Sequence, residues 1–172
     1  MKKLFIICGI SFAGKSTLGK AMAERFNYTE VDVDNVKIQL YGPDIQDEDL
    51  HHEDWVRTYT ETDHLIERYL QAGKTVIDAS RNFRKEERQL ARQIATTLNA
   101  EVVTIFVDTP EAVARQRLLE NRKKPSRRDV SDEGFEEILH TIELPAADEN
   151  PLVFHDGDHI ESWISSNISL LS

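Results

Sequence analysis

The chain has 172 residues, of which 40% are hydrophobic and 30% charged, with a net charge of −10 and one cysteine. This length suits one domain with its own core, and the composition is that of a globular rather than a disordered protein. The apolar run at residues 4–8 is far shorter than the ~20 residues of a membrane span, and no signal-peptide cleavage site follows it. A lone cysteine cannot form an internal disulfide. We therefore expect a cytoplasmic protein without a membrane partner.

The charges are unevenly distributed along the chain. Acidic residues outnumber basic ones by 31 to 21, which argues against extended contact with nucleic acid or with anionic membranes. The exception is the segment 115–128, which holds seven Lys and Arg residues against one acid, Glu120. This segment is either a local anion site or a solvated helix face followed by a loop.

Short apolar runs alternate with longer segments of helical periodicity. In chain order, we predict strands at 3–8, 28–33, 75–78, 101–107 and 152–155, and helices at 15–26, 34–40, 53–71, 84–98, from about 108 to the basic break at 123–129, at 131–142 and at 158–170. This alternation predicts an α/β fold in which helices cover both faces of a parallel sheet. Ligands of such sheets bind beyond the carboxyl ends of the strands, so the residues that follow those ends form the candidate site.

Residues 9–17, after the first predicted strand, fit the pattern G-x-x-x-x-G-K-[ST]. Its glycines let the backbone curl so that N–H groups face phosphate oxygens, and the following helix directs its positive end at the same anion. Lys15 can reach the β- and γ-phosphates, the Ser16 hydroxyl can bind Mg²⁺, and Thr17 can reach the α-phosphate. We therefore expect ATP and Mg²⁺ here, with nucleotide contacts from Gly9, Ser11, Ala13, Gly14, Lys15, Ser16 and Thr17.

Carboxylates follow two further predicted strands. Alternation along the strand 28–33 would place Asp32 and Asp34 on one face, where one holds Mg²⁺ and the other accepts the proton of an attacking hydroxyl. Alternatively, both are solvent-facing acids, or Asp34 caps the short helix after it. Asp78 ends the third strand and is a candidate for the substrate and Mg²⁺ site. Arg81, close behind it, either binds a substrate anion or is an exposed turn residue.

Two arginines flank the end of the predicted fifth helix, just before the basic break. Arginines at such a place can close over a triphosphate and neutralise charge during phosphoryl transfer. Arg117 is therefore a candidate nucleotide-binding residue and Arg122 a candidate catalytic residue. We expect only two or three of the seven basic residues to face one ligand.

With these motifs, the sequence resembles the small P-loop kinases of the adenylate-kinase-like group. Within that group it is similar to the branch that includes polynucleotide 5′-hydroxyl kinases, zeta toxins and chloramphenicol phosphotransferase. The resemblance runs from the first strand to about Pro145. Besides the phosphate loop, it rests on residues similar to the family's segments before and after a lid: 103–111, Arg117, Leu118, Arg122, Phe135, Glu136 and 143–145.

The resemblance implies a three-layer α/β/α fold with five parallel strands in the order 2-3-1-4-5. It implies one domain over residues 1–172 with a mobile lid at about 122–130. Asp34 stands where polynucleotide kinases keep the acid that activates the hydroxyl, and Lys37 stands where they keep an arginine, which makes Lys37 a candidate substrate-binding residue. The Asp32–Asp34 pair is also similar to that of shikimate kinases, but residues 78–81 lack their glycine-rich turn, which favours the first branch.

These observations together predict an enzyme that moves the γ-phosphate of ATP to a hydroxyl group of a small molecule. Its catalytic residues would be Lys15, Asp34 and Arg122. Two alternatives remain: a kinase of polynucleotide 5′-hydroxyl ends, and a nucleotide-dependent switch or accessory ATPase without an acceptor. A switch needs no acid opposite the loop, so Asp34 discriminates between these functions. The acceptor itself is not readable from residues 41–60, which would hold it.

Overall fold

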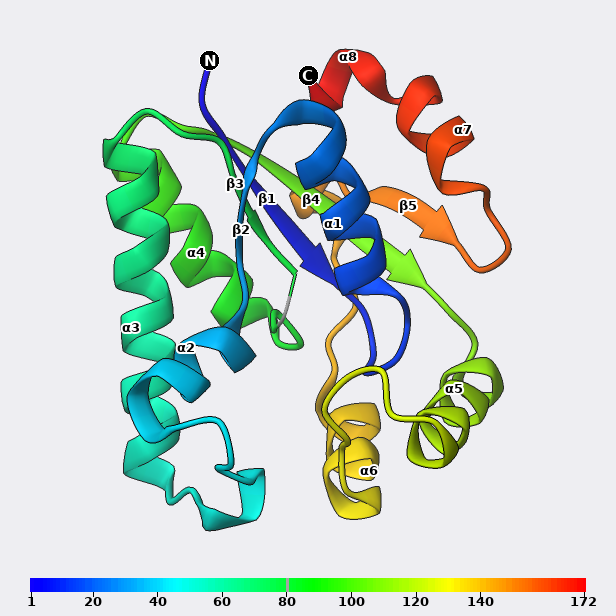
Figure 1. Cartoon of the computed structure of the whole chain (residues 1–172). Coiled ribbons are helices and arrows are strands. Elements are labelled where there is room, and N and C mark those ends of the chain that lie inside the picture. The colour runs from blue at the N-terminus through cyan, green and yellow to red at the C-terminus, as the bar shows by residue number, and fades with distance from the viewer. Residues whose placement is uncertain (80) are drawn as a thin grey trace.

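Five parallel strands form the centre of the computed structural model, which describes residues 1–79 and 81–172 (Figure 1). They are β1 (Lys3–Cys8), β2 (Thr29–Val31), β3 (Val76–Asp78), β4 (Glu101–Asp108) and β5 (Leu152–His155). The order across the sheet is β2-β3-β1-β4-β5, and every neighbouring pair is parallel. All six residues of β1 are buried, as expected for the strand at the centre. The predicted strand order is therefore confirmed.

Helices cover both faces of this sheet. They are α1 (Lys15–Phe26), α2 (Val33–Tyr41), α3 (His52–Gln71), α4 (Lys85–Thr97), α5 (Glu111–Lys123), α6 (Asp132–Thr141), α7 (Ile160–Ser166) and α8 (Ile168–Leu171), with short 3₁₀ turns at Asp47–Asp49 and Ala147–Glu149. In Figure 1, α3 and α4 lie on one side of the sheet, α1, α7 and α8 on the other, and α5 and α6 beyond the strand ends. This is the predicted three-layer α/β/α fold of P-loop NTPases. Among the described residues, no helix is both long enough and apolar enough to cross a membrane.

The side chains of β1 alternate between two cores. Phe5 and Ile7 pack in the core shared with α1 and α7, whereas Leu4 and Ile6 pack in the core shared with α3 and α4. A third, smaller cluster contains Phe12, Ala114, Leu118 and Phe135. It attaches the loop after β1 to α5 and α6, so these two helices lie beside the carboxyl end of the sheet, where ligands of such folds bind.

The prediction of one terminal helix at 158–170 was wrong. The structure has two helices, α7 and α8, which meet at Asn167. The side-chain amide of Asn167 donates a hydrogen bond to the carbonyl of Trp163 at 2.8 Å. The backbone N–H of Asn167 donates to the same carbonyl at 3.1 Å, so Asn167 is the C-terminal cap of α7.

Candidate functional site

The loop between β1 and α1 depends on two glycines with positive φ. A Cβ on Gly9, at φ +144°, would lie 2.6 Å from the carbonyl oxygen of Val107 on β4, so a side chain cannot be accommodated there. Gly14, at φ +109°, stands directly before α1, and no side chain of the described residues caps that helix. The first N–H groups of α1 therefore remain available to an anion, as the sequence motif predicts.

Lys15 is buried although it has no carboxylate partner within the described ranges. Its Nζ donates to the carbonyls of Gly9 and Ile10 at 2.8 and 2.9 Å and lies 4.8 Å from the ring centroid of Phe83. Burial, together with the nearby charge of Arg127, lowers the pKa of Lys15 to about 7. An anion beside this amine would stabilise its charged form.

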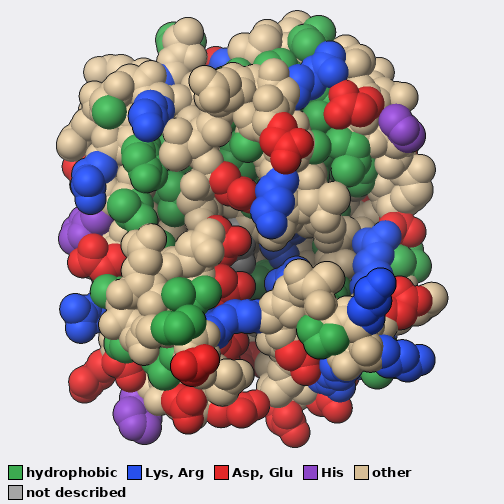
Figure 2. Space-filling model, in the orientation of Figure 1, with side chains coloured by type: hydrophobic (Ala, Val, Ile, Leu, Met, Phe, Trp, Pro, Cys, Tyr) green, Lys and Arg blue, Asp and Glu red, His purple; other side chains and the backbone are tan. Residues whose placement is uncertain are grey.

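A cavity beside Lys15 brings together residues from four parts of the chain. Figure 2 shows that basic and acidic side chains meet around a hollow near the middle of this face. The cavity is lined by Ser11, Phe12, Ala13, Gly14, Lys15, Ser16, Asp32, Asp34, Ala79, Phe83 and Arg127. Most of the predicted phosphate-loop residues are therefore at the cavity, but Thr17 is exposed on α1 and Gly9 lies against β4.

The two aspartates reach this cavity by a different route from the predicted one. The strand β2 ends at Val31, and Asp32 is the N-cap of α2, where its carboxylate accepts a hydrogen bond from the backbone N–H of Asp34 at 2.8 Å. The prediction that both aspartates share one face of a strand was therefore wrong, and the cap is Asp32 rather than Asp34. A helix turn still leaves both carboxylates at the cavity.

The donor set at the cavity is suited to Mg²⁺. Burial raises the pKa of Asp32 above its usual value, and a cation beside the carboxylate would oppose this effect. Within the described part of the chain, no group of three His, Cys, Asp or Glu residues could hold a metal ion. Mg²⁺ does not need such a group, because it keeps several water ligands and binds one or two protein oxygens together with phosphates. The Ser16 hydroxyl and the Asp32 carboxylate supply oxygens of this kind.

Two cations that the sequence assigned to substrate binding are held in ion pairs. Lys37 of α2 contacts Asp34 at 2.9 Å and also Asp47, and its Nζ lies 5.0 Å from the ring centroid of Trp55. Arg81 contacts the carboxylates of Asp63 and Asp78, the latter at 3.4 Å, and its guanidinium lies 5.7 Å from the ring centroid of Tyr59. These carboxylates raise the pKa of Arg81 despite its burial. Lys37 and Arg81 are thus neutralised within the protein.

The arginines of the basic segment lie at different places. Arg117 reaches the phosphate loop, since its Nη1 donates to the carbonyl of Ala13 at 3.0 Å, and it also pairs with Asp156 at 2.7 Å. Arg122 instead contacts Asp129 at 3.1 Å and Asp132 at 2.8 Å, and it does not line the cavity.

The arginine that does line the cavity is Arg127, which lies 4.5 Å from the ring centroid of Phe12. In the sequence, Arg127 could not be distinguished from the other basic residues of its segment. Nothing in the sequence around Phe83 indicated that it would line the cavity.

A second cavity, of about 490 Å³, is also lined by Phe12. Buried Asn121 shapes its wall, because its Oδ1 accepts the backbone N–H groups of Ser126 and Arg127 at 3.0 and 3.1 Å. The wall consists of Phe12, Arg117, Glu120, Asn121, Lys124, Pro125, Ser126 and Arg127. The two cavities share Phe12 and Arg127, so they form adjoining parts of one site.

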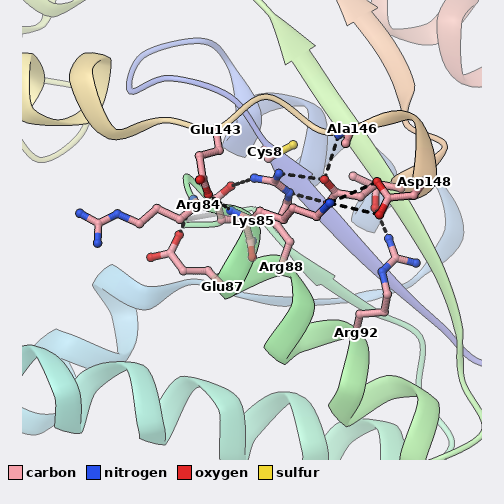
Figure 3. Close-up of polar contacts among 12 residues, drawn as sticks. Cys8, Arg84, Lys85, Glu87, Arg88, Arg92, Glu143, Ala146 and Asp148 are labelled. Atoms are coloured by element: carbon pink, nitrogen blue, oxygen red, sulfur yellow. Dashed lines mark hydrogen bonds and ion pairs between the residues drawn. The ribbon is translucent and has the colours of Figure 1, made fainter.

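A buried ion pair holds the turn that carries Phe83 (Figure 3). Arg88 of α4 is fully buried, and its Nε and Nη2 donate to the two carboxylate oxygens of Glu149 at 2.7 and 2.9 Å. Its Nη1 donates to the carbonyl of Asn82 at 3.2 Å, and the N–H of Glu143 donates to the carbonyl of Phe83 at 2.8 Å. The hydrogen bonds from Arg88 hold the pKa of Glu149 below its usual value. The segment after α6 thereby fixes Phe83 at the cavity.

A comparison with protein families identifies the domain. The family model described as AAA domain matches residues 4–145. The chain belongs to the AAA domain family. The match includes the phosphate loop, both cavity aspartates and the basic segment, and it ends before β5. No curated protein matches the chain.

Solved structures with the same fold cover nearly the whole chain. APS kinase CysC of Mycobacterium tuberculosis, in complex with AMPPNP and APS, is 20% identical with a TM-score of 0.72, over 99% of this chain and 97% of that chain. A gluconokinase of Sinorhizobium meliloti 1021 is 17% identical with a TM-score of 0.65, over 98% and 91%. Kti12 of Chaetomium thermophilum, in complex with ADP-AlF3, is 15% identical with a TM-score of 0.76, over 98% and 99%. Because these sequence identities are low, the similarity shows that the chain shares the fold of these proteins.

Proposed function

We propose that the protein is a kinase that moves the γ-phosphate of ATP to a hydroxyl group of a small molecule. The observation that carries this proposal is that the carboxylate of Asp34 lines the same cavity as Lys15 and Ser16. A protein that only binds nucleotide needs the loop but has no need of a general base beside the γ-phosphate. The names of two structural neighbours, an APS kinase and a gluconokinase, support the same class of reaction.

In the proposed reaction, Asp34 accepts the proton of the acceptor hydroxyl. The hydroxyl oxygen then forms a bond to the γ-phosphorus, the bond from that phosphorus to the bridging oxygen breaks, and ADP leaves. Lys15 and the N-terminus of α1 stabilise the charge on the phosphate oxygens. Ser16 and Asp32 would hold Mg²⁺, which neutralises phosphate charge when bound.

The basic residues have separate proposed roles around the nucleotide. Arg117 and Arg127 border both the phosphate loop and the second cavity, so we assign them to the nucleotide. The segment 122–130 forms the proposed lid, and Arg122 would act only after this segment moves toward the phosphates. In the present structure, Arg122 is bound to carboxylates of that same region.

The test is a transfer assay with purified protein, radiolabelled ATP and Mg²⁺. The acceptor panel contains nucleosides, sugars, antibiotics and 5′-hydroxyl oligonucleotides. We expect label in at least one small molecule and none in a parallel reaction with Lys15→Ala. Label only in oligonucleotides would assign the protein to the polynucleotide kinases. ADP formation without any labelled acceptor would identify an ATPase or switch and would overturn the proposal.

A further inference from the structure

Two cations are buried on the acceptor side of the cavity, by which we mean α2, the segment 42–51, α3 and residues 78, 79 and 81–83. Lys37 is 1% exposed and Arg81 is 5% exposed. Each of them contacts two carboxylates, and each lies near the face of an aromatic ring, Trp55 or Tyr59. Both cations are therefore already satisfied by the protein and are not free to bind a ligand anion.

The charge balance on this side is negative. Two buried cations face four carboxylates, those of Asp34, Asp47, Asp63 and Asp78. Arg128 of the proposed lid adds one further positive charge, with its Nη1 3.9 Å from Asp47 and its Nη2 donating to the carbonyl of Pro43 at 3.1 Å. An anion that enters here meets more carboxylates than cations.

Polar atoms without partners lie at the same end of β3. Asp78 is fully buried, and its Oδ1 has no hydrogen-bond partner in the described ranges; Ala79, the next residue, lines the cavity. The side-chain amide of buried Asn82 is equally unpaired at both its oxygen and its nitrogen. A lone carboxylate oxygen requires a donor, and an amide both donates and accepts. A hydroxyl group can meet both requirements, because it donates and accepts. An ammonium group can serve only the two oxygens, and a carboxylate, sulfate or phosphate only the amide nitrogen.

On the basis of the proposed kinase activity, we infer that the acceptor is an alcohol without an anionic group: a neutral polyol or an amino alcohol. An anionic acceptor would have to displace a carboxylate from Lys37 or Arg81, or lie unscreened beside Asp34. Displacement at Arg81 leaves the buried Asp78 or the largely buried Asp63 unpaired, and displacement at Lys37 breaks its ion pair with Asp34 or Asp47. The second alternative brings like charges together, and both are unfavourable.

Matched acceptors that differ in charge test this inference. Glucose, glucosamine and gluconate carry similar hydroxyl chains but are neutral, cationic and anionic at pH 7; glycerol, serinol and glycerate form a second set. We expect kcat/KM for the neutral or cationic member to exceed that for the anionic member at least about tenfold at equal ionic strength. A preference for gluconate or glycerate would overturn the inference.

A binding measurement tests the same inference without turnover. With the phosphate loop occupied by Mg²⁺ and AMPPNP, calorimetric titration of the intact protein with sulfate and with gluconate should show no binding. Asp47→Asn, at an exposed position, and Asp47→Asn with Asp63→Asn should gain affinity about tenfold or more, because the first leaves Lys37 with one carboxylate partner and the second does the same for Arg81 as well. Binding of either anion to the unaltered protein as tightly as to these variants would refute the inference. This result stands even if the transfer assay finds no kinase activity.

A further variant addresses an exposed arginine next to Phe83. Arg84 directly follows that cavity residue and has no carboxylate partner among the described residues. If it served an anionic acceptor, the unaltered protein would bind gluconate and Arg84→Gln would lose that binding. We expect Arg84→Gln to match the unaltered protein in gluconate titration.

Discussion

The phosphate-loop side and the acceptor side of the cavity treat their cations in opposite ways. On the phosphate-loop side, the two cations that line the cavity, Lys15 and Arg127, have no carboxylate partner within the described chain, whereas Arg117, which does not line it, pairs with Asp156. On the acceptor side, Lys37 and Arg81 have two carboxylates each. The comparison teaches that the number of basic residues near a cavity does not show what it binds. Their pairing within the protein does.

The difference has a physical cause. Burial without a counter-ion opposes the charged form of an amine, which is why the pKa of Lys15 falls to about 7. A bound phosphate would supply the missing negative charge. The cost of burying the charged Lys15 amine is therefore offset only when phosphate is bound. Arg81 experiences comparable burial, but Asp78 and Asp63 raise its pKa, so its charge is stabilised in the protein alone.

The largest effect is expected from the phosphate-loop side. Lys15→Ala should reduce transfer by about 10³–10⁵-fold, the range for losing a cation that stabilises the transition state of phosphoryl transfer. The fold should persist, because the Lys15 amine contacts loop carbonyls and not a core side chain. The measurement is kcat with circular dichroism on the same sample. Lys20→Ala, an exposed lysine of the same helix, is the matched control. Normal turnover by Lys15→Ala would remove the basis of the comparison.

The second effect concerns the carboxylate between the two sides. Asp34→Asn keeps the shape but cannot accept a proton, so transfer should fall by about 10²–10⁴-fold while the dissociation constant of ATP changes by only a few fold. Because Asp32 is the helix cap, loss of a cap should not contribute to any change in melting temperature. Asp44→Asn, in the exposed loop after α2, is the control. An unchanged transfer rate for Asp34→Asn would assign Asp34 to the pairing of Lys37 alone.

The smallest effect is expected at the lid. Trypsin should cleave between residues 123 and 128 in the absence of nucleotide, and ATP with Mg²⁺ should slow this cleavage several-fold as the segment closes. If protection from trypsin depends on phosphate bound at the loop, it should require Lys15. The Lys15→Ala variant tests this in the same assay. Cleavage at exposed Arg57 of α3 serves as the internal reference. Equal rates at 123–128 with and without nucleotide would contradict closure.

The parts of the site that follow from local sequence were predictable. The pattern of residues 9–17 requires a strand before it and a helix after it, and both are present as Lys3–Cys8 and Lys15–Phe26. Strand positions followed from short apolar runs, and the strand order followed from the family resemblance. Asp34 was placed at the cavity for an incorrect reason, because the helix α2 begins one residue before it and periodicity in a segment this short does not separate a strand from a helix turn.

Features that depend on distant contacts were not predictable. Asp63 lies in the middle of α3, and nothing in its neighbourhood in sequence indicates that it pairs with Arg81, 18 positions later. Likewise, Arg127 lines the cavity because the Asn121 amide holds the backbone of residues 126 and 127, whereas Arg122 is turned toward acids of its own segment. Composition marked this segment as basic but could not show which side chain faces the ligand.

The ion pair between Arg88 and Glu149 affects the order in which parts of the protein can fold during synthesis. The two residues are 61 positions apart, so a ribosome makes the arginine well before its partner. Until Glu149 emerges, the nascent chain contains the whole nucleotide-binding motif, yet Arg88 cannot be buried without leaving its charge unpaired. We therefore expect the turn that carries Phe83 to reach its final position only after residue 149 has been made.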